Sequence, residues 1–578
     1  MPNFSAILPW YVVAMLAALL SSGCASLPTG VQRPVSTALA APETTPMGQW
    51  VQSRKASAGA RSNSAFFLLE TEELALSARV ALVDGARKTL DLQYYAIHAD
   101  ASTETVLDRL RSAAQRGVRV RLLLDDLNTV GRDAQVLRLA FEPNVQIRLF
   151  NPIPGHRASL LGRLLGALPD ISRLQKRMHN KLFLADNALG IIGGRNLGDA
   201  YFGQDKTTNF VDIDVLAAGR IVRDMSVSFD SYWNSEQAYP VQSLVTGAEL
   251  EALRQPPSAN AGEQTTAVPV ALAIPGAEAA TKTSKTPPEP GAPALTPVAS
   301  VTTGTRTTVL PDVTASFALE SLMNLKQLPL TWAPSMLLAD QPGKIALEEG
   351  VGTGNGGDDG ATVIDGMLTL MDKAKRDLLI VSPYFVPGHK MMLRFAALRT
   401  RGVTIRVLTN SLASNDAPAA HAGYARYRPA LLAMGVELYE MRADQQRHLS
   451  GFGTLGGSRS SANAAGSTGS SASLHSKAVV ADASLMAIGS MNLDLRSRLQ
   501  NTEVAMVVRS RSLAKKVVTL VEATLNTGAY RVTQEGSQLV WRAPQGTNIP
   551  DVTNEPDASL GLRLLVNLIG PFAPDEML

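Results

Sequence analysis

Helical and strand-like patterns of hydrophobic residues alternate along the first half of the chain. Residues 71–90 and 103–115 carry apolar positions at the spacing of one helix face, while residues 91–96 and 119–124 are short, mostly apolar runs. Such runs are typical of strands that are buried in a sheet. Helices that alternate with them predict an α/β domain with a largely parallel sheet.

The second half of the chain repeats this order of elements. Helical periodicity covers residues 363–376 and 390–400, and strand-like runs cover residues 377–382 and 401–408. The last of these runs is similar to Arg116–Leu123. Internal duplication predicts two tandem α-β-α domains that are related by a pseudo-twofold axis, with a site at their interface.

Changes in composition divide the chain into six segments. Stretches rich in Ala, Thr, Pro and Ser with little periodicity predict flexible connections. The predicted segments are an N-terminal signal or anchor (1–24), a flexible tether (25–63), the first domain (64–245), an interdomain linker that is partly of low complexity (246–360), the second domain (361–540) and a C-terminal tail (541–578). The tail contains an amphipathic helix, which we expect to pack on the core.

The N-terminal segment resembles a bacterial lipoprotein signal. Its apolar run Ile7–Leu20 is shorter than the roughly 20 residues that a spanning helix needs. The run leads to Cys24, the only cysteine of the chain. We interpret Cys24 as a lipidation site, with an uncleaved anchor as the alternative. Both predict a protein that is held at a membrane of the bacterial cell envelope and faces the periplasm.

One motif with the pattern H-x-K-x4-D occurs twice, once in each predicted domain. After six further residues each copy continues into two small residues, one variable residue and an Asn. The recurring positions are His179, Lys181, Asp186, Gly193, Gly194 and Asn196 in the first copy, and His475, Lys477, Asp482, Gly489, Ser490 and Asn492 in the second. A spacing that recurs at so many positions predicts a shared function.

The residue types of the motif suit phosphodiester chemistry. In a strand, His179 and Lys181 project from the same face, as do His475 and Lys477. If the two copies face each other, one neutral His can attack phosphorus and form a phosphohistidine, while the other gives its proton to the departing oxygen. The lysines and asparagines would stabilise the phosphate oxygens. This chemistry needs no metal and no cofactor, and we expect neither.

The motifs resemble those of the phospholipase D superfamily, and their flanks resemble its bacterial cardiolipin synthase branch, most closely the C-type enzymes. The supporting stretches are Leu92–Tyr95, Arg116–Asp126, Arg177–Lys181, Gly193–Gly203, Ser382–Pro387 and Asn492–Ser497. The resemblance implies two phospholipase-D-like domains and a phosphatidyltransferase that makes cardiolipin from phospholipids in a bilayer. It also implies phosphatidylglycerol as the acceptor and phosphatidylethanolamine as one candidate donor.

The resemblance also assigns roles to individual residues. Asp212 matches the position from which the family takes a carboxylate to orient a catalytic His, and Asp214 is the competing candidate. Glu503 is the counterpart of Asp212 in the second domain, and we expect it to orient His475. In the family the N-terminal His, here His179, is usually the nucleophile, although the symmetry of the motifs permits either order.

Several residues near the motifs have expected structural roles. Asp186 and Asp482 lie at turns, five residues after each Lys, and we expect them to cap backbone amides or pair with basic residues. His421 is expected to be a structural histidine. Four further residues either line the site or brace the hairpins, namely Arg195, Asp494, Arg496 and Ser497.

Two segments permit two interpretations each. Residues 157–168 place leucines on one face beside basic residues, which predicts either a helix at the membrane interface or a helix that packs on its own core. The Gly/Ser-rich residues 450–473 precede the second motif and predict either a mobile lid or a disordered insertion.

Composition narrows the alternative functions. The net charge is only +3 and aromatic residues make up 5% of the chain, so we expect no nucleic-acid partner. The alternatives are a phospholipase D that releases phosphatidic acid, a phosphodiesterase or nuclease, and a non-catalytic lipid-binding scaffold. Two complete sets of His, Lys and Asn argue against the scaffold. No feature of the sequence indicates an obligate protein partner, and the motifs leave the choice between transfer and hydrolysis open.

Overall fold

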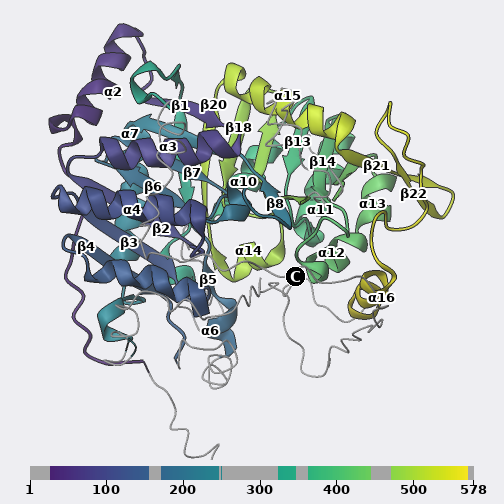
Figure 1. The fold of residues 1–578 in the computed structure, drawn as a ribbon. Coiled ribbons are helices and arrows are strands. Elements are labelled where there is room, and N and C mark those ends of the chain that lie inside the picture. The colour runs from purple at the N-terminus through teal and green to yellow at the C-terminus, as the bar shows by residue number, and fades with distance from the viewer. Residues whose placement is uncertain are drawn as a thin grey trace, which may run out of the picture.

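The computed structural model describes residues 27–129, 131–154, 171–245, 249, 323–345, 362–443 and 470–570. These residues form two mixed sheets of nine strands each, which lie side by side with helices packed on their faces (Figure 1). The predicted α/β class with two similar domains is confirmed.

The first sheet has the strand order β10-β4-β3-β2-β6-β7-β9-β1-β11. Strands β2, β3 and β4 are parallel, and β6 and β7 form the antiparallel hairpin of the first motif. The strands are β1 (Ser64–Leu69), β2 (Thr89–Tyr94), β3 (Arg119–Asp125), β4 (Val145–Phe150), β6 (Leu182–Ala185), β7 (Leu189–Gly193), β9 (Asp214–Gly219), β10 (Ala238–Pro240) and β11 (Thr331–Trp332). Its main helices are α3 (Glu72–Gly85), α4 (Ala101–Gln115) and α7 (Arg220–Trp233).

The second sheet has the strand order β12-β20-β18-β17-β13-β14-β15-β21-β22. Read from its β22 end, this order repeats the arrangement of the first sheet. Strands β13, β14 and β15 are parallel, and β17 and β18 form the hairpin of the second motif. The strands are β12 (Ser335–Ala339), β13 (Asp377–Val381), β14 (Thr404–Asn410), β15 (Glu437–Met441), β17 (Ala478–Ala481), β18 (Leu485–Gly489), β20 (Val504–Arg509), β21 (Ala529–Glu535) and β22 (Gln538–Arg542). Its main helices are α10 (Val363–Asp372), α11 (Gly388–Thr400) and α15 (Arg511–Thr527).

Two short parallel strand pairs join the domains. β5 (Arg177–Met178) pairs with β19 (Asn501–Thr502), and β8 (Thr208–Val211) pairs with β16 (Ser471–Leu474). One cluster of buried apolar side chains also contains residues of both sheets. Because β5 and β16 each lead directly into a motif histidine, these pairs fix both motifs relative to the opposite domain.

The segment that we expected to be a flexible tether, residues 25–63, packs against the first domain from residue 27 onward. Helix α2 (Pro46–Ser57) contributes side chains to the core of that domain. Before this helix, the buried guanidinium of Arg121 donates a hydrogen bond to the carbonyl of Ser36 (2.8 Å). The expectation is wrong because it rested on the lack of hydrophobic periodicity. A polar segment without such a pattern can still be held in place when its backbone carbonyls accept hydrogen bonds from buried charged groups.

Part of the predicted interdomain linker is also structured. Residues 323–345 add β11 to the edge of the first sheet and β12 to the edge of the second. The chain therefore passes from one sheet to the other between two neighbouring strands. The low-complexity part of the linker lies outside the described residues.

Three further predictions fall wholly or largely on residues that the structure does not describe. They concern the N-terminal signal or anchor with Cys24, the helix of residues 157–168, and the loop of residues 450–473, of which the structure describes only 470–473. Of the helices in the described part of the chain, none is both long and apolar enough to span a membrane.

The C-terminal helix α16 (Leu560–Ile569) packs as expected on one side only, where Val566 joins a small buried cluster with Leu412, Ala422 and Ala558. Val566 is the buried residue of this helix, and α16 contacts α12 (Pro418–Ala425). Its exposed leucines are Leu560 (72% exposed), Leu564 (61%), Leu565 (43%) and Leu568 (69%). The expectation holds for one side alone, because the apolar residues of α16 cover more of its circumference than one neighbouring helix can bury.

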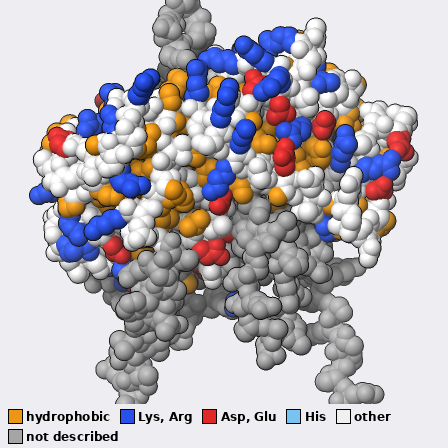
Figure 2. All heavy atoms as spheres, turned by 90° about the horizontal axis from the view of Figure 1, so that it is seen from above, with side chains coloured by type: hydrophobic (Ala, Val, Ile, Leu, Met, Phe, Trp, Pro, Cys, Tyr) orange, Lys and Arg blue, Asp and Glu red, His pale blue; other side chains and the backbone are white. Residues whose placement is uncertain are grey.

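The face seen from above carries many Lys and Arg side chains over both domains, with apolar and acidic side chains among them (Figure 2). On this face the cations do not gather into a single groove of the kind that would follow a nucleic-acid backbone.

Candidate active site

Each motif ends in an aspartate that holds the neighbouring backbone. Asp186 accepts hydrogen bonds from three successive backbone N–H groups at the start of β2, the shortest from Lys88 (2.7 Å). Asp482 accepts the equivalent bonds at the start of β13, the shortest from Arg376 (2.8 Å). The predicted role of both aspartates in capping backbone amides is confirmed.

The two motif histidines lie at the domain interface, each beside a carboxylate. His179 Nδ1 is 3.0 Å from Glu503 Oε2, and His475 Nδ1 is 2.9 Å from Asp212 Oδ2. All four side chains are buried. A carboxylate that accepts the Nδ1 proton fixes the tautomer of the ring and leaves Nε2 as the reactive nitrogen.

Each carboxylate comes from the domain opposite to its histidine, which corrects one expectation. From its position Glu503 is expected to orient His475, but it contacts His179. The reason is the pairing of the short strands. β5 and β19 run in parallel into His179 and Glu503, and β8 and β16 run in parallel into Asp212 and His475.

Asp212, and not Asp214, is the carboxylate that reaches a histidine. Asp214 instead forms buried ion pairs with Arg79 (2.9 Å) and Arg195 (3.4 Å). Gly194 makes room for the Asp212 side chain, because a Cβ at this glycine would collide with the carboxylate. Asp212 thus contacts a catalytic histidine, whereas Asp214 stabilises the first domain through its ion pairs.

The motif lysines lie against their histidines. Lys181 Nζ donates to the backbone carbonyl of His179 (2.7 Å). Lys477 Nζ donates to the carbonyl of His475 and lies 3.1 Å from its ring Nδ1. Both lysines are buried. Their positive charges are therefore held beside the imidazoles, where a phosphate group would bind.

The motif asparagines differ in their partners. Asn196 donates to the hydroxyl of Tyr201 (2.8 Å) and accepts from the N–H of Ala96 (3.2 Å). The ring of Tyr201 lies edge-on to His475, with 5.3 Å between the centroids. The buried Oδ1 of Asn492 has no hydrogen-bond partner in the described part of the chain. Of the two motif asparagines, Asn492 is therefore the one whose side-chain oxygen can still accept a hydrogen bond.

Aromatic rings that sequence reasoning had given no role form part of the wall. Tyr95 lies edge-on to His179 (5.1 Å between centroids), and Phe210 lies 5.0 Å from His475. Lys181 also lies over the Tyr95 ring (5.5 Å). These rings exclude water from the imidazoles. In the sequence they look like ordinary buried strand positions, so only their closeness to the histidines identifies them.

Ser490 is one of the recurring motif positions, but sequence reasoning gave its hydroxyl no role. Its hydroxyl donates to Glu503 Oε2, the oxygen that also faces His179. The signal that could have found it is its place in the motif, where the first copy has Gly194. A hydroxyl at one copy and none at the other makes the two carboxylate environments unequal.

The remaining candidates are structural or border the site. Arg195 braces the hairpin through its pair with Asp214. His421 is buried and contacts Arg428 (2.8 Å), so its predicted structural role is confirmed. Asp494 caps α14 (Leu495–Leu499). Within the described ranges, no group of three or more His, Cys, Asp and Glu residues is placed to hold a metal ion.

A family model described as "Cardiolipin synthase, PLD-like domain" matches residues 80–233 and 367–525, once in each domain. The chain belongs to this family. It is therefore a member of the phospholipase D superfamily, in the cardiolipin synthase branch, and an enzyme of the phospholipase D type.

Two relatives and one solved structure extend the comparison. Cardiolipin synthase C of Escherichia coli K12 is 35% identical over 452 residues, 78% of this chain and 82% of the relative. An uncharacterized protein of Helicobacter pylori J99 is 31% identical over 505 residues, 87% of each chain. The phosphatidylserine synthase of Haemophilus influenzae Rd KW20 covers 91% of this chain and 99% of its own at a TM-score of 0.52 and 11% identity, a likeness of fold alone.

Burial dominates the electrostatics of this phospholipase-D-type site. It lowers the pKa of His179 to about 4, although Glu503 acts in the opposite direction. The pKa of His475 also lies well below its ordinary value, because of burial and of the charges of Lys477 and Lys181. Near pH 7 both imidazoles are therefore neutral before a substrate binds, which is the state that a nucleophile needs.

The pKa values of the charged residues beside the histidines also differ from their ordinary values. Burial lowers the pKa of Lys477 to about 8, while Asp212 acts against this shift. Burial alone would raise the pKa of Glu503, but His179 and Lys181 hold it below its ordinary value. Near neutral pH the carboxylate of Glu503 is therefore ionised. It can stabilise positive charge that forms on the His179 ring.

Proposed function

We propose that the enzyme transfers a phosphatidyl group from a donor phospholipid to phosphatidylglycerol and thereby makes cardiolipin. The observation that carries this proposal is one buried site in which two histidines each hold a carboxylate of the opposite domain. The membership in the cardiolipin synthase family and the 35% identity to a cardiolipin synthase C support it.

In the first half of the reaction, Nε2 of His179 attacks the phosphorus of the donor. A P–N bond forms, the P–O bond to the donor head group breaks, and the departing oxygen takes a proton from His475. The negative charge of the bound phosphodiester raises the pKa of His475, so that the ring can hold this proton. Asp212 then stabilises the imidazolium through Nδ1.

In the second half, neutral His475 takes a proton from the acceptor hydroxyl. The acceptor oxygen attacks phosphorus, the P–N bond breaks, and His179 is released unchanged. A glycerol hydroxyl of phosphatidylglycerol gives cardiolipin, whereas water gives phosphatidic acid. The two lysines stabilise the phosphate oxygens in both halves, because they are held at the histidines.

The proposal includes attachment to a membrane of the cell envelope on the periplasmic side. Its support is the N-terminal sequence, in which an apolar run precedes the single Cys24. Cells that are fed a labelled fatty acid should incorporate it into the wild-type protein and not into Cys24→Ser. Equal labelling of both proteins would contradict lipidation at this residue.

The test of the reaction uses purified full-length protein and vesicles of phosphatidylethanolamine and phosphatidylglycerol. Mass spectrometry should detect cardiolipin with the wild type and none with His179→Ala. Omission of each lipid in turn identifies the donor and the acceptor. Accumulation of phosphatidic acid alone would show hydrolysis instead of transfer, and unchanged lipids would refute the phospholipid reaction.

A further inference from the structure

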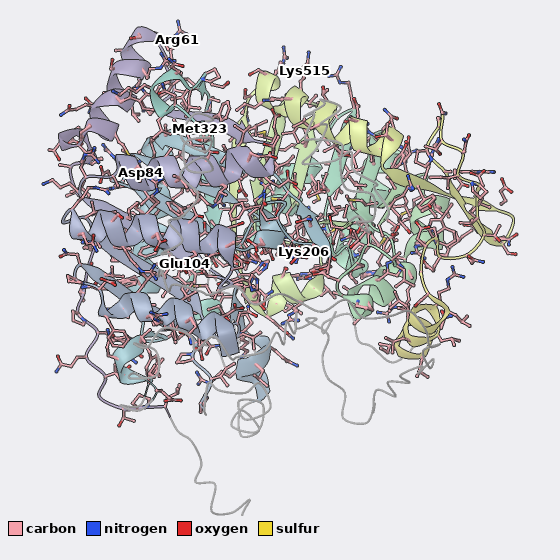
Figure 3. The ribbon with its side chains drawn as sticks, in the orientation of Figure 1. Arg61, Asp84, Glu104, Lys206, Met323 and Lys515 are labelled. Carbon is pink, nitrogen blue, oxygen red and sulfur yellow. The ribbon has the colours of Figure 1, made fainter. Side chains whose placement is uncertain are left out.

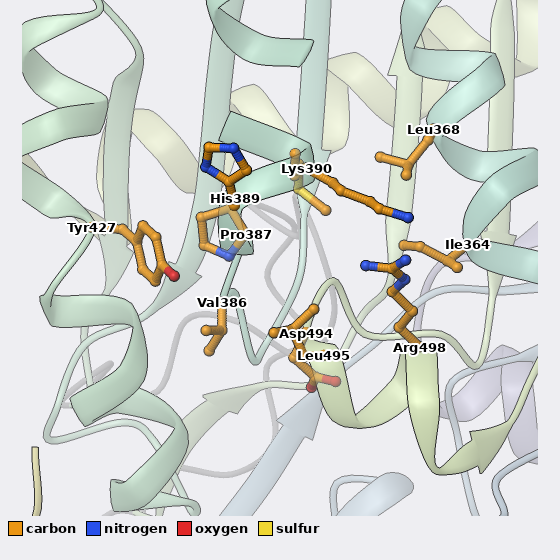
Figure 4. A pocket seen from close by; sticks show the side chains of 11 residues that line it. Ile364, Leu368, Val386, Pro387, His389, Lys390, Tyr427, Asp494, Leu495 and Arg498 are labelled. Atoms are coloured by element: carbon orange, nitrogen blue, oxygen red, sulfur yellow. The ribbon is translucent and has the colours of Figure 1, made fainter. Parts of the chain in front are cut away.

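A cavity of about 260 Å³ lies in the second domain between helices α10, α11 and α14 (Figure 4). It contains neither motif histidine. One of its lining residues is Asp494, which follows Asn492 by two positions and whose charge acts on Lys477. The cavity therefore adjoins the catalytic site but is separate from it.

The lining of this cavity combines apolar and positively charged groups. Ile364, Leu368 and Leu495 provide an apolar wall. Lys390 and Arg498 reach into the same space, and Figure 4 shows their charged ends on the same side of it. Apolar surface next to clustered cations suits an anionic amphiphile better than it suits a free ion or an uncharged lipid.

Among the residues that the structure describes, no ion pair of Lys390 or Arg498 is found. Lys390 is exposed and Arg498 half-buried, so an anion can reach both from the solvent. Two like charges at one small cavity repel each other unless an anion lies between them. The carboxylate of Asp494 is already engaged by the backbone N–H of Ser497 (2.6 Å), as the cap of α14. Asp494 is the one carboxyl among the lining residues, and burial raises its pKa to about 7, so near neutral pH the cavity carries more positive than negative charge.

We propose that this cavity binds the phosphodiester of the acceptor phospholipid, with Lys390 and Arg498 as its ligands. The inference rests on the proposed function, because the synthesis of cardiolipin requires a second lipid whose hydroxyl attacks the phosphohistidine. In phosphatidylglycerol that hydroxyl is separated from its own phosphate by the three carbons of one glycerol. The acceptor phosphate must therefore bind about one head group away from the histidines, in a site that adjoins theirs.

Asp494 lies where the glycerol would pass. Burial raises the pKa of this carboxyl to about 7, so its negative charge is reduced beside an incoming phosphate. One of its oxygens accepts the N–H of Ser497, which leaves the other to accept a hydroxyl hydrogen bond from the glycerol. The wall of the cavity thus contains a group for the glycerol as well as cations for the phosphate.

The test measures which fraction of the phosphohistidine intermediate reacts with the acceptor lipid and which fraction reacts with water. Lys390→Ala and Arg498→Ala should each lower the ratio of cardiolipin to phosphatidic acid by about tenfold, as expected for loss of one charge-assisted contact to a phosphate. Consumption of donor lipid should change by less than about threefold, since the histidines are intact. Lys390→Arg keeps the positive charge and should bring the ratio most of the way back to that of the wild type. Lys515 lies on the far side of the second domain (Figure 3), so Lys515→Ala should leave the ratio unchanged.

A ratio that stays unchanged in both alanine variants would overturn the inference, as would an equal fall with Lys515→Ala. A separate arm measures the affinity of His179→Ala for short-chain phosphatidylglycerol by calorimetry. The added Lys390→Ala should weaken binding by about tenfold, and unaltered affinity would overturn the inference. This arm does not require turnover, so it remains decisive if the wild type makes no cardiolipin and the proposed function itself fails.

Helix α16 carries a second, independent inference. Leu560, Leu564 and Leu568 follow each other at intervals of four residues and form an exposed apolar stripe. The helix contains no acidic residue, and its one charged residue is Arg563. An exposed apolar stripe beside a cation has the character of a helix that lies in the interface of an anionic bilayer.

We infer that α16 rests on the bilayer that contains the lipid substrates. The helix packs on α12, which follows Asp416, and Asp416 accepts a hydrogen bond from Tyr384 (2.8 Å) at the border of the catalytic site. In Figure 1, α12, α14 and α16 lie along one edge of the second domain. A bilayer that covers α16 would therefore lie on the side where the substrate cavity is formed.

An environment-sensitive fluorophore tests this contact in the full chain. In a Cys24→Ser background, Leu564→Cys carries the label. The matched control is Val227→Cys on α7, which is exposed to a similar degree (70% against 61%). Vesicles with phosphatidylglycerol should shift the emission of the label at position 564 to the blue and leave the control unchanged. No shift at 564, an equal shift at 227, or a shift that protein concentration alone produces would overturn the inference.

Discussion

The two halves of the catalytic site share one backbone but differ in their neighbours. Glu503, which holds His179, also accepts a hydrogen bond from the hydroxyl of Ser490. The other half has Gly194 at the place of Ser490, and this glycine has no hydroxyl to offer to Asp212. Duplication thus supplied the geometry twice, and later differences made the two carboxylates unequal.

The lysines sharpen this difference. Both lysines donate to the backbone carbonyl of their own histidine, but Lys477 also lies 3.1 Å from a ring nitrogen of His475. A cation beside a ring makes its imidazolium a stronger acid, because loss of the proton relieves repulsion. The surroundings of His475 therefore suit a proton donor to the leaving group, and those of His179 suit a nucleophile whose positive charge is stabilised.

The largest expected effect comes from removal of the histidines, and an activated substrate separates their roles. His179→Ala should lower turnover of natural lipids by about a thousandfold or more, because no P–N bond can form. His475→Ala should lower it by about 10²- to 10⁴-fold. With a phosphatidyl ester of p-nitrophenol, whose leaving group needs no proton, rapid mixing should show a burst of nitrophenolate for His475→Ala and none for His179→Ala.

The opposite pattern, a burst in His179→Ala and none in His475→Ala, would reverse the assignment of nucleophile and acid. Loss of the burst in both variants would contradict the division of labour between the two halves. Trapping of the adduct by acid quench, followed by peptide mapping, identifies the phosphorylated histidine directly.

The carboxylates should follow the histidines that they touch across the interface. Glu503→Gln and Asp212→Asn should each lower turnover of natural lipids by about a hundredfold, since both keep the shape but lose the charge that stabilises an imidazolium. The activated ester should rescue the first step in Asp212→Asn but not in Glu503→Gln. If each carboxylate instead served the histidine of its own domain, the activated ester would rescue Glu503→Gln and not Asp212→Asn. The burst experiment therefore also tests whether the carboxylate–histidine contacts cross the domain interface.

The sequence predicted the parts of the site that repeat and missed those that cross between domains. The hairpins, the histidines and the capping roles of Asp186 and Asp482 follow from one local pattern that occurs twice. The contact of Glu503 with His179 depends on β5 and β19, which pair over two residues each and carry no periodic signal. Position within a domain could only suggest the wrong histidine.

The same limit explains why the tether was predicted wrongly and the packing of α16 only in part. Residues before α2 have no apolar period, but their backbone carbonyls satisfy the guanidinium of Arg121, a requirement that arises only after folding. Helix α16 has an apolar pattern, but no pattern reveals whether a partner surface exists for each of its faces. Hydrophobic periodicity reports which faces can be buried and not what lies against them.

Exchange of the residues that differ between the halves should have intermediate effects. Gly194→Ser places a Cβ against the carboxylate of Asp212 and should lower turnover by about 10- to 100-fold through displacement of His475. Ser490→Gly removes one hydrogen bond to Glu503 and should lower it by about 3- to 10-fold. Steady-state kinetics with both lipids measures this, and equal effects of the two changes would mean that the halves are interchangeable.

The smallest effect is a dependence of stability on pH to which both histidines contribute. Both have a pKa in the folded state below the ordinary value of about 6.5, so the unfolded chain binds more protons in mildly acidic solution. Their contribution to stability is fully present above pH 6.5 and is lost as the pH falls. For His179 the loss ends near pH 4, the approximate value of its folded pKa. The pKa of His475 is also lowered, by burial and by the charges of Lys477 and Lys181.

Urea unfolding of the full chain between pH 7.5 and pH 3.5 measures this loss. Each histidine should contribute a slope of at most about 1.4 kcal/mol per pH unit, and His179→Asn or His475→Asn should remove its share between pH 6.5 and 4. Both variants should flatten the curve in this range, because burial and the charges of Lys181 and Lys477 oppose the protonation of both rings. A curve that neither variant changes would contradict the lowered pKa of the two histidines.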